Sequence, residues 1–105
     1  DLPGEPRAAY MAAVLAGRAG DREGVRKNLE RALEWLAPMD EKLLGENPTL
    51  LLIRGLAYYD LGNYEAAIGS LTPYLQRAPR DIGARKALGD AVLHVGGGDA
   101  VAVLE

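Results

Sequence analysis

Apolar residues recur at three- and four-residue spacings along most of the chain, and glycine, asparagine and proline divide them into blocks. Between residues 22 and 36, this spacing places Val25, Leu29, Ala32, Leu33 and Leu36 along one helical face. No segment alternates with a period of two for long enough to indicate a strand. The pattern therefore predicts an all-α fold.

Capping and breaking residues predict where these helices begin and end. The expected helices span residues 7–19 (with Pro6 at the first helical position), 22–36, 48–61, 64–77 and 82–95. Gly20-Asp21 and Gly62-Asn63 predict tight turns, because glycine accepts the left-handed conformation and Asp or Asn caps the next helix. Asp81 is expected to cap the fifth helix. Gly96-Gly97-Gly98 is expected to end it, with Asp99 capping a sixth, truncated helix.

Two places depart from simple alternation of helix and turn. Residues 37–47 are rich in breakers and predict an enlarged connection, in which Met39–Leu44 adds a turn or two of helix. Pro73 lies inside the fourth predicted helix, where it removes a backbone donor and crowds the carbonyl of Gly69. We therefore expect a bend there.

Residues 48–81 carry small and large residues at regular intervals: Leu51, Gly55, Ala57, Tyr58, Gly62-Asn63-Tyr64, Ala67, Leu71 and Pro79. This block resembles the tetratricopeptide repeat, a helical hairpin of about 34 residues. Arg54 departs from the family's usual Leu. The resemblance implies a right-handed α-α superhelix, a solenoid of about 2.5 helical hairpins forming one domain over residues 1–105.

The flanking residues resemble further copies of the repeat. Residues 6–37 look like a diverged copy and residues 82–105 like a partial one. The turns at Gly20 and Gly62 are 42 residues apart, which exceeds the standard period by about eight residues. We assign the surplus to residues 37–47, which then offer a surface absent from a regular array.

Composition narrows the possible functions. The chain has 12 basic and 15 acidic residues, a net charge of -3 and no cysteine, so we expect no nucleic-acid partner and no thiolate chemistry. The run of large aliphatic residues from Leu50 to Ile53 is too short to insert into a membrane. His94 is the only histidine and no metal-ligand spacing is present. We therefore expect no metal, no cofactor and no enzymatic activity.

In the resembled family, the first helix of each hairpin lines a concave groove. The matching positions are Tyr10, Val14, Leu52, Leu56, Tyr59, Asp60, Lys86, Asp90 and His94. The stripe of Leu52, Leu56 and Tyr59 predicts a groove that accepts an extended or helical peptide. Alternatively, these side chains pack against neighbouring first helices or further repeats. Family members that bind a C-terminal carboxylate use Lys, Asn and Arg where this chain has Tyr10, Val14 and Ile53, so we expect no carboxylate clamp.

The predicted function is a protein-protein interaction scaffold that binds a peptide or partner protein through its groove or through residues 37–47. The alternative is a structural spacer or a self-association module, which would form a homodimer. Because the chain lacks an initial Met and residues 99–105 read as the start of a helix, we expect it to be part of a longer solenoid. Its composition, rich in Ala, Gly, Leu and Arg, is similar to that of long bacterial repeat proteins that accompany envelope or exopolysaccharide export systems. The location is left open between cytoplasm and periplasm.

Overall fold

The computed structural model describes the backbone of residues 4–104 and the side chains of residues 5–96. Within this part of the chain there are six helices and no strand, which confirms the all-α prediction. The helices are α1 (Gly4–Arg18), α2 (Arg22–Leu36), α3 (Glu41–Glu46), α4 (Pro48–Asp60), α5 (Tyr64–Arg77) and α6 (Ile82–Leu104). None of the described helices is both long and apolar enough to cross a membrane.

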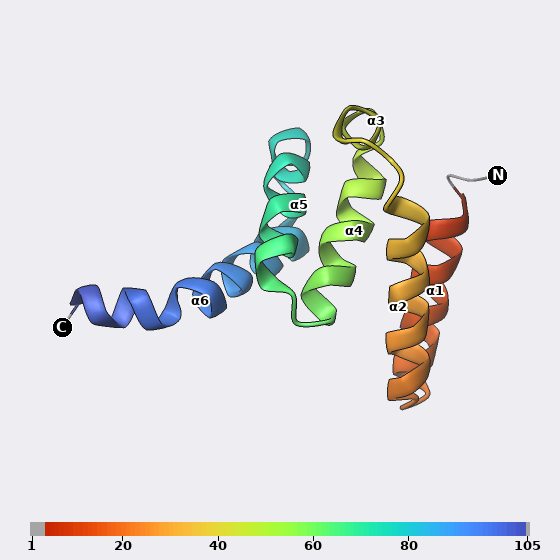
Figure 1. Cartoon of the computed structure of the whole chain (residues 1–105), viewed down its shortest axis with the longest axis horizontal. Coiled ribbons are helices and arrows are strands. Elements are labelled where there is room, and N and C mark those ends of the chain that lie inside the picture. Colours follow the sequence, from red (N-terminus) through yellow and green to blue (C-terminus); the bar gives the residue numbers. More distant parts are fainter. Residues whose placement is uncertain (1–3, 105) are drawn as a thin grey trace.

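The helices form two hairpins followed by one long helix (Figure 1). α1 pairs with α2, and α4 pairs with α5. α4 also contacts both helices of the first hairpin, and α6 contacts α5 and α4 in the same manner. Short α3 lies between the hairpins and packs against α4. The helical-hairpin arrangement expected from the sequence is compatible with this order.

The two predicted turns lie where the sequence placed them. Gly20 and Gly62 have φ values of +77° and +85°, which side chains with a Cβ rarely adopt. After each glycine, a side-chain oxygen caps the next helix: Asp21 accepts from the amide of Gly24 at 2.9 Å, and Asn63 accepts from that of Ala66 at 3.4 Å. Each hairpin therefore closes through a glycine and a capping residue.

The paired helices approach closely because small residues lie at their crossing. A Cβ built on Gly55 would lie 2.6 Å from Cδ2 of Leu71, well inside van der Waals contact. Ala57 and Ala67 are fully buried nearby. A larger side chain at Gly55 would hold α4 and α5 apart.

The enlarged connection contains a real but short helix, α3. Asp40 caps it by accepting a hydrogen bond from the amide of Leu43 at 2.8 Å, and Leu44 is buried. Arg54 of α4 donates two hydrogen bonds to Glu41 and a third, from Nε, to Oγ of Ser70 in α5. The extra helix is thus attached to the second hairpin rather than left as a loop.

The predicted break at Gly96-Gly97-Gly98 is wrong. α6 runs without interruption from Ile82 to Leu104, so Asp99 lies inside it rather than capping a sixth, separate helix. A glycine in a helix interior costs about 1 kcal/mol relative to alanine but does not forbid helical geometry. Gly96 is followed by Gly97, which has no side chain to cap a new helix. The C-terminal half of α6 therefore extends away from the two hairpins (Figure 1).

Pro6 and Pro73 both lie within helices of the structure. α1 begins at Gly4, so Pro6 is not its first residue, but it still lies in the first turn, where amides have no intrahelical acceptor. α5 continues through Pro73 to Arg77, so this proline does not end the helix. The bend expected at Pro73 stays a prediction.

Candidate protein-binding surfaces

The predicted site residues lie on three neighbouring helices. Tyr10 and Val14 belong to α1, while α6 carries Lys86, Asp90 and His94. α4, which contacts both α1 and α6, carries the remaining four, Leu52, Leu56, Tyr59 and Asp60. We call these nine residues together the first-helix face.

The apolar residues of the first-helix face are half-buried. Tyr10, Leu52, Leu56 and Tyr59 pack against the edge of the main core. Part of each side chain therefore already joins neighbouring helices, as the alternative interpretation of the stripe expects, and part stays accessible. Ile53, at one of the clamp positions, is only 5% exposed and belongs to the core.

A network of polar and aromatic side chains joins α4, α5 and α6. The hydroxyl of Tyr59 donates to Oδ2 of Asp90 at 2.7 Å, and the hydrogen bond, together with burial, raises the pKa of Tyr59. Tyr64 lies edge-on to Tyr59, with ring centroids 5.8 Å apart, and stacks on His94 at 4.1 Å. His94 Nδ1 is 2.9 Å from the backbone carbonyl oxygen of Asp90.

Three of the predicted residues, Tyr59, Asp90 and His94, are thus brought together. Sequence reasoning missed Tyr64, the first residue of α5. Its position directly after the Gly62-Asn63 turn is the signal that could have found it, because that turn places it beside the end of α4. The network fixes the position of α6 relative to the second hairpin.

A second group joins α4 to α1. Burial raises the pKa of the Asp60 carboxyl group, and burial, followed by the negative charge of Asp60, raises the pKa of Tyr10. The Asp60 side chain nevertheless stays exposed on the first-helix face. Such a carboxylate favours a positively charged group of a partner. Val14 and Lys86 take part in neither group.

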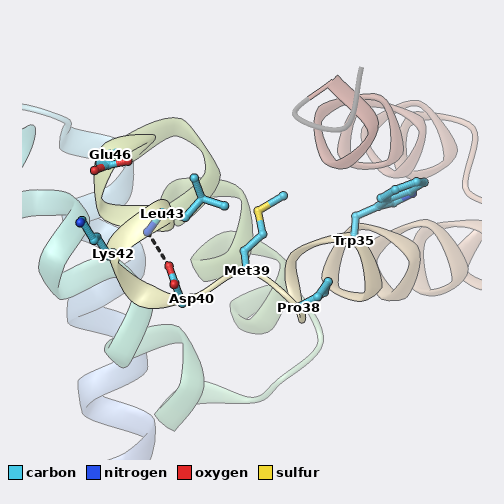
Figure 2. Close-up of a pocket in the computed structure, with 7 residues that line it drawn as sticks. All are labelled: Trp35, Pro38, Met39, Asp40, Lys42, Leu43 and Glu46. Atoms are coloured by element: carbon cyan, nitrogen blue, oxygen red, sulfur yellow. Dashed lines mark hydrogen bonds between the residues drawn. The ribbon is translucent and has the colours of Figure 1, made fainter.

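A separate hollow lies where α2 leads into α3 (Figure 2). It has a volume of about 700 Å³, within the range of about 300 to 1,000 Å³ typical of ligand pockets. Its lining consists of Trp35, Pro38, Met39, Asp40, Lys42, Leu43 and Glu46. We call it the Trp35 hollow.

The Trp35 hollow is apolar inside and charged at its edge. Figure 2 shows the side chains of Trp35, Met39 and Leu43 around one space, with Lys42 and Glu46 to one side. Leu43 is 43% exposed although it is a large apolar residue. The sequence predicted an unusual surface over residues 37–47 but did not indicate that Trp35 forms part of it.

The described residues contain no group of three histidine, cysteine or acidic side chains that could hold a metal ion. The chain matches no protein-family model, and comparison with curated proteins and with solved structures finds no significant match to either. The candidate surfaces therefore rest on their own geometry.

Proposed function

We propose that this protein is a tetratricopeptide-like scaffold, a right-handed stack of helical hairpins that binds a peptide or partner protein across the first-helix face. The proposal is supported by the order of the helices, because α1, α4 and α6 each begin a hairpin or occupy the place of a first helix. It is also supported by the agreement between this order and the repeat-like spacing of residues 48–81. Binding itself is the proposed activity.

The observation that carries the proposal is the combination of the half-buried leucines of α4 with the exposed carboxylate of Asp60 at the same helical spacing. Leu52 and Leu56 lie one helical turn apart, and Asp60 follows at the same spacing. This arrangement suits a peptide that inserts apolar side chains over the leucines and places a lysine or arginine beside Asp60. A hydrogen bond to a charged group of this kind contributes about 1.5 to 3 kcal/mol.

The test begins with a displayed library of random 12-residue peptides selected on the whole protein. Selected peptides are then measured by fluorescence anisotropy against the wild type, Asp60→Asn and Leu43→Glu. We expect enriched peptides to be basic, to lose about tenfold in affinity with Asp60→Asn, and to bind Leu43→Glu normally. Trp35 is the only tryptophan and lines the Trp35 hollow, not the first-helix face. Its fluorescence emission should therefore not change when a peptide binds.

Failure to enrich any peptide contradicts the proposal. Loss of binding in Leu43→Glu alone, accompanied by a change in Trp35 emission, contradicts the first-helix face as the site. That result would assign binding to the Trp35 hollow, the second surface that the sequence suggested. The circular dichroism of each variant shows whether the helices are retained.

A second candidate function, self-association, is favoured by α1. Met11 and Leu15 are 56% and 59% exposed and lie four residues apart, so they form an apolar patch on one helical face. Light scattering over a range of concentrations tests this candidate. A mass that rises with concentration, and that Leu15→Glu returns to the monomer value, would favour the structural role over peptide binding.

A further inference from the structure

α6 repeats the burial pattern of α4 at an interval of 34 residues. Leu50, Ile53 and Ala57 of α4 correspond in this way to Ala84, Ala87 and Ala91 of α6. All six side chains are buried. α6 therefore packs on the second hairpin with the same face that α4 turns towards the first.

In α4 a second face is covered by α5. Gly55 receives Leu71 at close range, and the neighbouring Arg54 bonds to Ser70. The equivalent residues of α6, again 34 positions later, are Gly89 and Leu88. A Cβ built on Gly89 would meet no atom within 4 Å among the described residues. The close approach seen at Gly55 thus has no counterpart at Gly89.

The uncovered face of α6 is hollow and apolar. A pocket of about 620 Å³ is lined by Leu75, Pro79, Arg85, Leu88, Gly89, Val92 and Leu93. We call it the Gly89 hollow. Val92 and Leu93 are 49% and 69% exposed. An exposed apolar hollow of this kind indicates a surface that a further element covers.

We propose that the Gly89 hollow is a docking site for one amphipathic α-helix of a partner protein, which lies against α6 as α5 lies against α4. The occupant is a helix because the hollow continues the α5–α6 interface, in which Leu75 of α5 already forms one wall. It carries a leucine-sized side chain over Gly89, as Leu71 lies over Gly55. This site is distinct from the first-helix face.

The equivalence also sets the direction of the partner helix. α5 runs antiparallel to α4, so a helix docked in the same way would bring its C-terminal end beside Arg85, one turn before Gly89. The free carbonyl groups at a helix C-terminus favour a neighbouring cation. Arg85 thus selects an antiparallel over a parallel helix.

The probe is a synthetic peptide with the sequence of α5, residues 64–77, in which Pro73→Ala removes the interior proline that disfavours helix formation. It is titrated into the whole isotopically labelled protein, and amide chemical shifts are recorded by nuclear magnetic resonance, which detects weak binding. We expect the largest shift changes at Gly89, Val92 and Leu93. Changing the probe residue that corresponds to Leu71 to alanine should weaken binding about tenfold.

Two substitutions on α6 provide a matched pair. Leu93→Glu places a charge in the hollow and should weaken probe binding about tenfold or more. Ile82→Glu changes an apolar residue that is equally exposed, at 68%, but does not line the hollow, and should leave the affinity unchanged. Both positions are exposed, so the fold should tolerate the two changes.

Three outcomes overturn the proposal. The first is an absence of shift changes at millimolar probe, and the second is shift changes concentrated on α4, which would mean that the probe replaces α5. The third is a concentration-dependent dimer that Leu93→Glu abolishes, since the occupant would then be a second copy of this chain. Loss of peptide binding at the first-helix face has no bearing on any of these outcomes.

Discussion

Arg54 donates two hydrogen bonds, at 2.8 and 3.1 Å, to the two carboxylate oxygens of Glu41 and so joins α4 to α3. The Arg54 side chain is only 15% exposed and also bonds to Ser70 of α5. Arg54 is one of the positions at which the 48–81 block departs from the resembled repeat, and Glu41 lies in the segment that exceeds the repeat length. These two departures are therefore one structural feature, in which a partly buried arginine holds the additional helix.

Replacing Glu41→Gln should lower the free energy of unfolding by about 0.5 to 1 kcal/mol. Hydrogen bonds to charged groups contribute more than this, but Glu41 is 74% exposed and water weakens the pair. Chemical denaturation measures the change, with Glu34→Gln, at an exposed position of α2, as the control. A double-mutant cycle with Arg54→Leu should return a coupling of similar size, and additive effects would contradict the link.

The two equivalent glycines, Gly55 and Gly89, should respond in opposite directions to alanine. Gly55→Ala places a Cβ against Leu71, so we expect a loss of about 1 to 3 kcal/mol from overpacking. Gly89→Ala places a Cβ in open space and should raise stability by up to about 1 kcal/mol through helix propensity. Thermal denaturation of both variants tests the pair, and a loss at Gly89 would show that this face is already covered.

Tyr74 and Asp81 should make stability depend on pH at both extremes. The hydroxyl of Tyr74 donates to Asp81 at 2.6 Å. This bond, assisted by the Ala84 amide, lowers the pKa of Asp81, and together with burial it raises the pKa of Tyr74 to about 12. The contribution of Asp81 is complete above its unfolded-state pKa of about 3.9 and is lost as the pH falls through the folded-state value. The contribution of Tyr74 is complete below about pH 10 and is lost as the pH rises through its folded-state pKa.

Tyr74→Phe should therefore flatten the pH dependence of the free energy of unfolding at both ends and lower it by about 1 kcal/mol or more near neutral pH. At the acid end some dependence should persist, because Asp81 still accepts from the amide of Ala84 at 3.0 Å. Urea denaturation at several pH values provides the measurement, with Tyr58→Phe as the control. An unchanged profile would show that the pair is not maintained in solution.

The sequence was most informative where one residue type has one physical role. Asp21 and Asn63 predicted helix starts because a side-chain acceptor is needed there, and both make that bond. Gly62 and Gly96 show that a glycine alone does not predict where a helix ends. They lie 34 residues apart, yet Gly62 forms a turn with φ of +85° and Gly96 lies within α6. Glycine permits both conformations, so the residues that follow it decide whether the chain turns or the helix continues.

The sequence proposed candidate site residues, but it did not predict which of their side chains make contact. The resemblance to the repeat placed Tyr59, Asp90 and His94 on first helices, but only the packing of α6 against α4 and α5 brings them together. Trp35 was missed because its partners, Met39 and Leu43, belong to a segment whose length does not follow the repeat. Such contacts depend on tertiary structure that local spacing does not encode.

The hydrogen bond from Tyr59 to Asp90 should hold α6 against the second hairpin. Tyr59→Phe removes that bond but keeps the ring on Tyr64, so we expect a loss of stability confined to the docking of α6. Amide hydrogen exchange should accelerate about two- to fivefold in residues 82–95 and change little in α1 and α2. Tyr58→Phe, also on α4, is the matched control. Equal acceleration in every helix would mean that α6 and the hairpins unfold as one unit, and the bond would then stabilise the whole fold rather than one of its surfaces.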